Sequence, residues 1–348
     1  MALSFTLSCP LPVTRHEAIV LGHGSGGRLT SQLVHELFLP AFDNPALRKL
    51  DDQAVLNVPP GRIAMTTDSY VVTPLFFPGG DIGHLAVNGT VNDLAMSGAK
   101  PLYLTAAFII EEGLALEDLQ RVVHSMARAA EDAGVSIVTG DTKVVNRGSA
   151  DKLFITTAGV GLVPDGVSIS ASNAHPGDVV IVSGPIGDHG ITIWSTREGI
   201  DLAGSLKSDT APLHALVEAM VGAGEVHVLR DPTRGGLGTS LCEIAGGSGV
   251  GIELEASAVP VREEVRAACE ILGMDPLFVA NEGRLLAMVA ESSAEAVLHA
   301  MRTAPHGREA CSIGRVVVDH PGMVLLRTEI GGSRILDMPF AEQLPRIC

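Results

Sequence analysis

Residues 116–143 read LEDLQRVVHSMARAAEDAGVSIVTGDTK, and this stretch decides the fold class. Its first part repeats apolar residues every three or four positions, the period of one face of an α-helix: Leu116, Leu119, Val123, Met126 and Ala130. Gly134 ends the helix, and the run 135–139 predicts a strand that delivers the residues 140–143 to its end. A helix that leads directly into a strand is typical of an α/β protein.

Similar alternation continues on both sides of this stretch. It predicts strands at 63–67, 104–110, 153–163, 179–183, 285–289 and 314–318, and helices at 213–221 and 294–302. A chain of 348 residues suits two domains, and the small polar stretch after residue 164 indicates a boundary near 165. We expect an N-terminal arm at 1–42, domains at 43–165 and 166–338, and a mobile tail at 339–348.

Composition excludes several classes of function. With 40 acidic and 24 basic side chains, the chain has a net charge of −16, which repels nucleic acid. The longest apolar stretch, 102–110, is too short to span a membrane. The 5 cysteines show no paired metal spacing, and their odd number predicts reduced thiols and a cytoplasmic protein. We therefore expect small ligands or protein partners.

A glycine-rich loop, GHGSGG at 22–27, lies between a strand-like run at 18–21 and a helix that begins near Arg28. Such a loop exposes backbone N–H groups to phosphate oxygens at a helix N-terminus. The loop spacing, with Asp51 further on, also fits the dinucleotide fingerprint, and a flexible glycine turn is the plain alternative. No Lys-Ser or Lys-Thr pair follows the glycines, so a Walker P-loop is excluded.

Acidic and amide side chains recur where we expect strands or loops to end: Asp51, Asp52, Asp68, Asn88, Asn92, Asp93 and Asp141. Turn or cap roles explain any one of them but explain the whole set poorly. Hard cations prefer oxygen ligands drawn from several elements, and magnesium bound in this way bridges the phosphates of a nucleotide. The set therefore predicts a magnesium and nucleotide site.

The last residue is a cysteine, Cys348. In extended form the residues from Phe340 onward span roughly 30 Å, so a mobile tail is able to carry the sulfur between a partner's active site and this chain's own. Chance, a dimerising thiol and a lipid attachment point are alternatives. Prenylation is the weakest of them, because that signal places the cysteine four residues from the end. We interpret the tail as a substrate-carrying arm.

These features closely resemble one family. The matching stretches cover nearly the whole chain: 22–27, 51–54, 66–70, 87–95, 140–143, 231–236, 281–283 and 345–348. The central motifs are similar to those of the superfamily that contains PurM (AIR synthetase), selenophosphate synthetase and ThiL. The closing Pro-Arg-Ile-Cys is similar to the ending of the HypE family of hydrogenase maturation factors.

The resemblance implies a dehydratase that uses ATP and Mg²⁺. A HypF-like carbamoyltransferase would place a carbamoyl group on the Cys348 sulfur, and the dehydratase would convert it to a thiocyanate. The nitrile would pass to a HypC–HypD complex as a cyanide ligand for the iron of nickel–iron hydrogenase. An amide oxygen is a poor leaving group, so phosphorylation by ATP makes it leave as phosphate while bases remove the nitrogen protons.

The resemblance also implies roles for individual residues. Magnesium and phosphates would be held by Asp51, Asp68, Asp93 and Asp141. The nucleotide and its phosphates would contact Gly24, Ser25, Gly26, Gly27, Asp52, Thr67, Asn88, Asn92 and Arg234. The catalytic residues would be Cys348, Glu282, Lys143 and His189.

Plain alternatives accompany several of these roles. Glu282 would be the base for the carbamoyl nitrogen, or the partner of a charge pair with Arg284. Lys143 would neutralise phosphate or stabilise the carbamoyl oxygen, or it is a surface lysine. Arg234 would bind anionic oxygens or cap a helix. His189 would lie near the docking site of the tail.

The fold that the family implies is an α/β (α+β) pair of domains of the PurM/AIR synthetase type. Strands of the first domain would form an interface barrel in a homodimer. Three other functions stay open. A kinase or synthetase of the same superfamily, acting on thiamine phosphate or a purine precursor, does not need Cys348. A selenophosphate synthetase needs a reactive cysteine followed closely by lysine near the N-terminus, where Cys9 is followed by Pro10. A non-catalytic thiol metallochaperone would bind metal without hydrolysing nucleotide.

Overall fold

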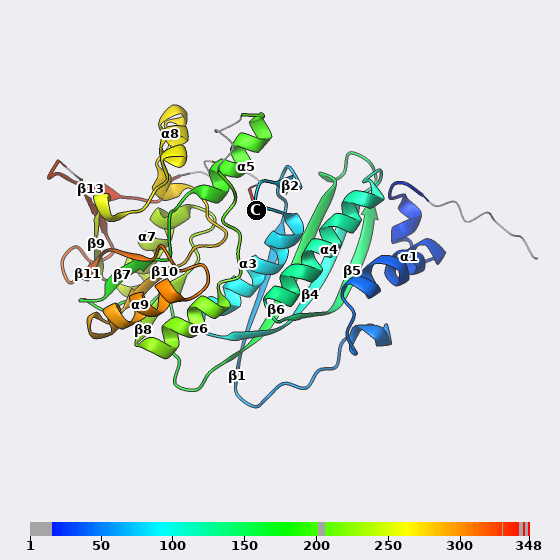
Figure 1. The fold of residues 1–348 in the computed structure, drawn as a ribbon, viewed down its shortest axis with the longest axis horizontal. Coiled ribbons are helices and arrows are strands. Elements are labelled where there is room, and N and C mark those ends of the chain that lie inside the picture. Colours follow the sequence, from blue (N-terminus) through cyan, green and yellow to red (C-terminus); the bar gives the residue numbers. More distant parts are fainter. Residues whose placement is uncertain (1–15, 201–205, 329, 341–343, 345–346) are drawn as a thin grey trace, which may run out of the picture.

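The computed structural model describes residues 16–200, 206–328, 330–340, 344, 347 and 348. Residues 1–15 of the expected arm and 341–343, 345 and 346 of the expected tail lie outside the described residues. The described residues form two α/β units that lie side by side (Figure 1).

A four-stranded sheet forms the first unit, in the order β1-β6-β4-β5. Its strands are β1 (Arg62–Tyr70), β4 (Lys100–Glu111), β5 (Ser136–Val145) and β6 (Leu153–Val163). β6 is antiparallel to β1 and β4, whereas β5 is parallel to β4. A parallel pair needs a crossover connection, which here is the helix α4 (Leu116–Asp132). The short strands β2 (Phe76–Phe77) and β3 (Gly80–Asp81) pair beside this sheet.

Helices cover one face of this sheet and leave the other open. α3 (Ile82–Met96) and α4 lie on the same face (Figure 1). Leu104, Ala106 and Phe108 of β4 are buried in the core that these helices share with the sheet. On β1, the side chains of Ile63 and Met65 are 55% and 70% exposed. Apolar side chains on an open face are typical of a surface that meets another protein.

A seven-stranded mixed sheet forms the second unit, in the order β13-β12-β9-β11-β7-β10-β8. Its strands are β7 (Val179–Val182), β8 (Val226–Arg230), β9 (Gly251–Glu255), β10 (Leu286–Val289), β11 (Cys311–Val317), β12 (Val324–Arg327) and β13 (Ser333–Leu336). Its helices are α5 (Asp188–Glu198), α6 (His214–Ala223), α7 (Gly236–Ser248), α8 (Glu263–Leu272) and α9 (Ala294–Thr303), with short helices at Ala256–Ala258, Pro276–Phe278 and Glu291–Ser293.

Helices cover both faces of this second sheet. Val180 and Val182 of β7 share a core with α7, whereas Ile181 between them shares a core with α6 and α9. Successive side chains of a strand point to opposite faces, so both faces are buried. This explains why the strand reads as a continuous apolar run in the sequence.

Short helices at the N-terminal side lie next to the β5 edge of the first sheet (Figure 1). They are Leu21–Gly24, α1 (Arg28–Leu33), Val34–Phe38, α2 (Leu39–Ala41) and Leu47–Lys49. The ring of Phe38 lies 4.9 Å from that of Phe108 in the first core. The strand expected at 18–21 is wrong, because only Ala18 forms a bridge and the residues that follow turn into a 3-10 helix.

Several expected elements are confirmed, and two strands are longer than expected. The helix expected at 116–133 is α4, and the strand expected at 153–163 is β6. β5 continues to Val145, so Asp141 and Lys143 lie within the strand and not beyond its end. β1 likewise continues through Asp68 to Tyr70. Pairing explains both extensions, because β4 and β6 supply partners along the whole length of these strands.

Asn88, Asn92 and Asp93 lie in the middle of α3, so the expectation that they end strands or loops is wrong. α3 lies between the first sheet and helix α6 of the second unit, and most of its residues are buried. Apolar residues therefore occupy every side of the helix. The periodicity that marks a surface helix is absent from its sequence for that reason.

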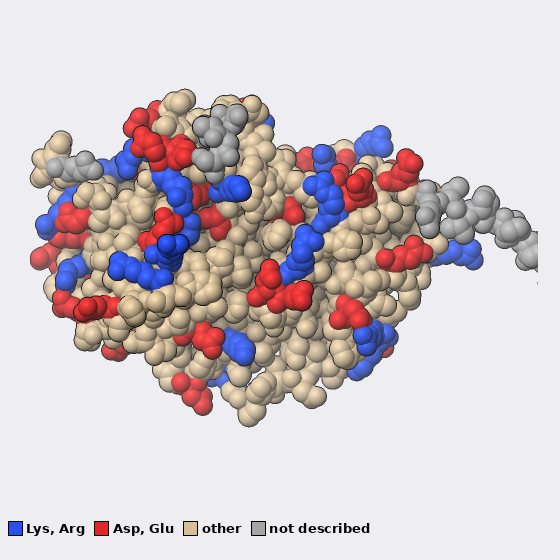
Figure 2. All heavy atoms as spheres, viewed as in Figure 1, with Lys and Arg blue, Asp and Glu red and all other residues tan. Residues whose placement is uncertain are grey.

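The surface carries charges of both signs. On the face in Figure 2, Lys and Arg side chains are interspersed with Asp and Glu and form no broad basic area. This face lacks the electrostatic footprint of a nucleic-acid-binding surface. Among the described residues, no helix is both long enough and apolar enough to cross a membrane.

Candidate active site

The C-terminal end of the chain lies in a cleft between the two units (Figure 1). The cleft has a volume of about 570 Å³. The charged and thiol side chains that line it include Asp68, Asp93, Asp231, Arg234, Glu282 and Cys348. Residues from distant parts of the sequence therefore meet around the terminal cysteine.

Backbone hydrogen bonds and apolar burial hold the last residues in this cleft. The N–H of Val71 donates to the terminal oxygen of Cys348 (3.0 Å). His189 Nε2 lies 2.6 Å from the carbonyl oxygen of Ile347. The side chains of Leu344 and Ile347 are buried in an apolar cluster that contains residues of both units. The end of the chain is thus docked at several points.

His189 acts on the tail as a neutral ring. It lies in the first turn of α5, fully buried, and its Nδ1 is 2.8 Å from the hydroxyl oxygen of Ser208. Burial lowers the pKa of His189 to about 4, so the ring is uncharged near neutral pH. A carbonyl oxygen only accepts hydrogen bonds, so the proton sits on Nε2 and is donated to Ile347, while Nδ1 accepts from Ser208.

The Cys348 thiol is protonated where it is docked. Arg234 Nη2 lies 3.9 Å from the sulfur. Burial raises the pKa of the thiol to about 12, and the nearby Glu282 adds to this shift while Arg234 opposes it. The thiolate is the nucleophilic form of cysteine, so the docked thiol is unreactive at neutral pH. The docked position therefore suits a Cys348 sulfur that has already been modified, because it no longer has to react as a nucleophile.

Glu282 lies deep in the cleft and is 4% exposed. Burial raises its pKa well above that of an ordinary glutamate, and the carboxylates of Asp209 and Asp231 contribute further. Its Oε1 has no hydrogen-bond partner among the described residues. A buried oxygen without a partner is costly in a native structure and marks a position where a bound group is able to interact.

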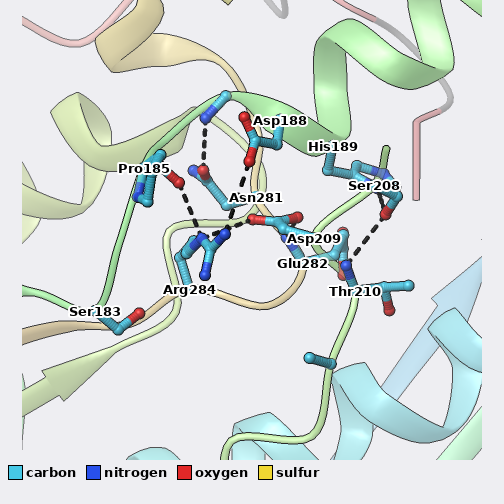
Figure 3. A network of polar contacts seen from close by, with 12 residues as sticks. Ser183, Pro185, Asp188, His189, Ser208, Asp209, Thr210, Asn281, Glu282 and Arg284 are labelled. Carbon is cyan, nitrogen blue, oxygen red and sulfur yellow. Dashed lines mark hydrogen bonds and ion pairs between the residues drawn. The ribbon is translucent and has the colours of Figure 1, made fainter. Parts of the chain in front are cut away.

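Asn281 fixes the loop that carries Glu282 (Figure 3). Its Oδ1 accepts from the N–H of Gly187 (2.8 Å), and its Nδ2 donates to the carbonyl of Pro232 (2.9 Å). These bonds connect the loop to the start of α5 and to the segment that follows β8. The same loop therefore has fixed positions relative to His189 and Arg234.

Arg284 anchors the other side of this loop (Figure 3). Its Nε donates to the carbonyl of Pro185 (2.9 Å) and lies 3.5 Å from a carboxylate oxygen of Asp209, and its Nη2 lies 3.7 Å from Asp188. Asp209 in turn accepts from the backbone N–H of Glu282 (3.0 Å). The charge of Arg284 is thus paired with two buried aspartates, and one of them, Asp209, holds the backbone of Glu282.

Asp68, Asp93 and Asp231 line the cleft together. Thr66 Oγ1 donates to Asp93 (2.7 Å). Burial raises the pKa of Asp93, and burial with the neighbouring Asp93 charge raises the pKa of Asp231 to about 7. Carboxylates that repel one another in this way are stabilised by a cation, and oxygen ligands suit Mg²⁺. Sequence reasoning missed Asp231, although it begins the motif at 231–236.

A second pocket, of about 380 Å³, lies between the N-terminal helices and β5. Its lining includes Gly26, Asp51 and Asp141, and the apolar side chains Phe38, Phe42 and Phe108. Lys143 Nζ lies 2.8 Å from Asp141 and lowers the pKa of its carboxyl. A mostly apolar pocket with a few polar groups at its rim is able to hold the flat ring of a nucleotide base.

The predicted magnesium ligands are divided between these two pockets. Asp68 is on β1 and Asp141 is on β5, the outermost strands of the first sheet. Three strand spacings separate them, which is about 14 Å at roughly 4.8 Å per spacing. Within one chain the predicted set therefore forms two pairs, Asp68 with Asp93 and Asp51 with Asp141.

The glycine loop packs against β5. A Cβ at Gly24 would lie 2.5 Å from the backbone nitrogen of Val144, so this position requires glycine. Ser25 Oγ donates to the carbonyl of Gly22 (2.9 Å), and Gly27 precedes α1. Asp52 is exposed and lines neither of these two pockets, whereas Thr67 lines the cleft.

The two predicted asparagines lie between the units. Asn92 Nδ2 donates to the carbonyls of Ala211 (3.0 Å) and Glu282 (3.2 Å), and its Oδ1 accepts from the N–H of Leu213 (2.8 Å). Asn92 thus uses its amide to attach α3 to the second unit, so its predicted contact with phosphate has no support in this geometry. Asn88 is also buried, and its Oδ1 has no partner among the described residues.

Known proteins match both units. Residues 50–163 match the family model "AIR synthase related protein, N-terminal domain", and residues 175–325 match "AIR synthase related protein, C-terminal domain". The carbamoyl dehydratase HypE of Azotobacter vinelandii is 56% identical over 335 residues, which cover 96% of this chain and 98% of that protein. This chain belongs to the HypE family. The HypE of Escherichia coli K12 is 50% identical and covers 95% of this chain and 99% of its own length.

Solved HypE structures share the fold. "Crystal Structure of Hydrogenase Maturation Protein HypE in complex with ATP" matches with a TM-score of 0.91 and 52% identity, over 94% of this chain and 99% of that one. "Crystal structure of HypE-HypF complex" matches with a TM-score of 0.78 and 50% identity, over 88% and 99%. A thiamine-monophosphate kinase of Stenotrophomonas maltophilia is 18% identical with a TM-score of 0.62, over 80% of this chain and 89% of its own, a likeness of fold alone.

The docked tail predicts slow alkylation of Cys348. His189→Ala removes the donor to Ile347, and loss of one hydrogen bond worth about 0.5–1.5 kcal/mol would raise the undocked fraction roughly two- to tenfold. We expect iodoacetamide to modify Cys348 faster in the variant by that factor, measured by mass spectrometry of the C-terminal peptide. Cys242, on α7, is the internal control in the same digest. An unchanged Cys348 rate would contradict the docked arrangement.

Proposed function

We propose that this chain converts an S-carbamoyl group on its own Cys348 to a thiocyanate in an ATP-dependent dehydration. The observation that carries the proposal is that the terminal sulfur lies in the same cleft as the buried Glu282 and as Arg234. The nitrile would supply a cyanide ligand for the iron of nickel–iron hydrogenase. Relatives named carbamoyl dehydratase and hydrogenase maturation protein support this assignment.

The reaction converts –S–C(=O)–NH₂ to –S–C≡N. Transfer of the γ-phosphoryl group of ATP to the carbamoyl oxygen gives ADP, and the C–O bond then breaks as phosphate leaves. Both N–H protons are lost, and their electron pairs form the remaining C–N bonds. The site must therefore bind phosphate, balance its charge and accept protons from nitrogen.

Glu282 suits the role of proton acceptor. Because burial raises its pKa, its carboxylate form is a stronger base than that of an exposed glutamate. Asp209 and Asn92 hold its backbone and so limit where the carboxylate is able to reach. Arg234, beside the sulfur, is suited to stabilise negative charge on the carbamoyl oxygen. His189 is suited to hold the tail in place.

ATP and Mg²⁺ complete the proposed chemistry. The pocket of Phe38 and Phe42 would receive the nucleotide base, with the glycine loop 24–27 near the phosphates. Asp68, Asp93 and Asp231 would hold Mg²⁺ in the cleft. Magnesium there would neutralise charge on the phosphate oxygens. An ATP complex of a relative supports the nucleotide.

We propose a homodimer through the open face of the first sheet, with the strands of two copies closing into an interface barrel. The exposed Ile63 and Met65 support this contact. A two-fold axis along the strands would put β5 of one copy opposite β1 of the other. The pairs of aspartates that are separated within one chain, Asp68 with Asp93 and Asp51 with Asp141, would then face each other across the dimer.

The carbamoyl donor would act on the released tail. The docked thiol is half-buried and its pKa is raised to about 12, so a HypF-like carbamoyltransferase would need Cys348 outside the cleft. A HypE–HypF complex of relatives supports this partner. A HypC–HypD complex would accept the nitrile, in the cytoplasm.

The proposed division of the chain is an N-terminal arm at 1–42, two domains at 43–165 and 166–338, and a tail at 339–348.

Mass spectrometry of the C-terminal peptide tests the activity. The chain is first carbamoylated with a HypF-type enzyme and carbamoyl phosphate, then purified and given Mg-ATP. We expect a carbamoyl adduct on Cys348 that loses the mass of one water with ATP. Glu282→Gln should slow this loss about 10²–10⁴-fold, because it removes the base, while Glu117→Gln on the exposed side of α4 should react at the wild-type rate.

Two outcomes would overturn the proposal. One is a carbamoyl adduct that stays intact with ATP in the wild-type chain. The other is a Cys348→Ala chain that turns over thiamine phosphate or a purine precursor with ATP as fast as the wild type, which would favour a kinase or synthetase. Metal binding without nucleotide hydrolysis would favour the metallochaperone.

A charge on the open sheet face tests the dimer. Met65→Lys places an ammonium group in the proposed interface and should convert the dimer to monomers and slow the dehydration. Val318→Lys changes a side chain that is 74% exposed on the second unit, and it should leave the dimer intact. Sedimentation velocity measures the oligomeric state of both variants. A dimer that survives Met65→Lys unchanged would contradict this interface.

A further inference from the structure

Two histidines and an aspartate meet at the start of the second unit, outside the cleft. His175 lies in the turn that leads into β7, Asp178 directly precedes that strand, and His227 lies on β8, the edge strand of the sheet. One ligand atom from each residue lies within 4.8 Å of the others. None of the three lines the cleft that receives Cys348.

The three side chains converge on a partly open position. His227 Nδ1 lies 3.0 and 2.9 Å from the two carboxylate oxygens of Asp178. The rings of His175 and His227 are 4.4 Å apart between centroids and inclined by 74°. Asp178 is buried, His227 is half-buried and His175 is exposed. A metal ion at this position would have protein ligands on the inner side and solvent on the outer side.

A further carboxylate lies behind His227. Its Nε2 is 3.2 Å from Glu225 Oε1, on the side of the ring away from Asp178. Histidines that bind metals commonly donate their second ring N–H to a carboxylate, which orients the ring and makes the ligand nitrogen more basic. The turn is also held in shape, because the N–H of His175 donates to Asp178 (2.9 Å) and the N–H of Asp178 to the carbonyl of His175 (3.0 Å).

We propose that His175, Asp178 and His227 bind a divalent transition-metal ion of the Zn²⁺, Ni²⁺ and Co²⁺ class, with Glu225 supporting His227. Imidazole ligands favour these ions, whereas Mg²⁺ and Ca²⁺ prefer sites built from oxygen alone. A hydrogen-bonded pair of Asp178 and His227 alone would not need His175. The metal site does need it, so His175 separates the two explanations.

The position of the site suggests what the ion does. His175 and Asp178 lie at the start of the second matched AIR synthase domain, 175–325, directly after the connection from the first, 50–163. His227 belongs to an edge strand whose other end leads to Asp231 and Arg234 in the cleft. An ion would attach the connection to this strand and stabilise the second unit by binding its folded form.

Cobalt binding to the untagged full-length chain tests the proposal. The chain is stripped with a chelator, freed of chelator and nucleotide, and titrated with Co²⁺ while visible absorption is recorded. We expect a saturable absorption band for one ion, with imidazole ligation, and displacement of that ion by Zn²⁺. His175→Ala should weaken this binding about 100-fold, and Glu225→Gln about 10-fold or more.

The matched control is His299→Ala, which removes an exposed histidine on α9. It should keep the wild-type affinity and band. Because His175 is exposed, its variant is expected to fold, and the melting temperature without metal verifies this. The proposal is overturned if His175→Ala binds Co²⁺ with the wild-type affinity and band, or if the wild-type chain shows no saturable band at millimolar Co²⁺.

Discussion

Two hydrogen bonds to the last residues of the chain are the constraint on which the site depends. The N–H of Val71 and the neutral ring of His189 hold the backbone of Cys348 and Ile347, so the terminal sulfur has a defined place between the units. Without them the cleft would contain Glu282 and Arg234 but not the terminal sulfur. The buried imidazole of His189 is well suited to hold the carbonyl of Ile347, since burial keeps the ring uncharged.

The electrostatics of the cleft follow from the burial of its charged groups between the two units and the docked tail. Burial raises the pKa values of Glu282, Asp93 and Asp231 and of the Cys348 thiol, because few waters remain to stabilise their charges. Carboxylates whose charged forms are disfavoured in this way are stabilised by a cation. This suits the proposed magnesium and nucleotide, and the proposed loading of the thiol would take place on the undocked tail.

Sequence patterns predicted those helices and strands whose formation depends on neighbouring residues in the sequence. α4 has a clear helical period and a terminating Gly134, and β6 is a clear β-branched run. α3 was misread because its burial on all sides removes that period, which placed Asn88, Asn92 and Asp93 at the wrong kind of position. The site residues carried by motifs were predicted through the family resemblance. Asp231 and Asp209 were missed, since their importance comes from contacts with residues far away in the sequence.

The pH dependence of a single turnover tests the central claim most directly. A chain already carbamoylated on Cys348 is mixed with Mg-ATP from about pH 5 to about pH 9, and nitrile formation is timed. Because the base acts only after losing its proton and burial raises the pKa of Glu282, the rate should rise with pH through an apparent pKa well above the roughly 4.3 of an ordinary glutamate. In Glu282→Gln the residual rate should be low and without this rise. A wild-type rate independent of pH, or a rise retained in Glu282→Gln, would contradict the account.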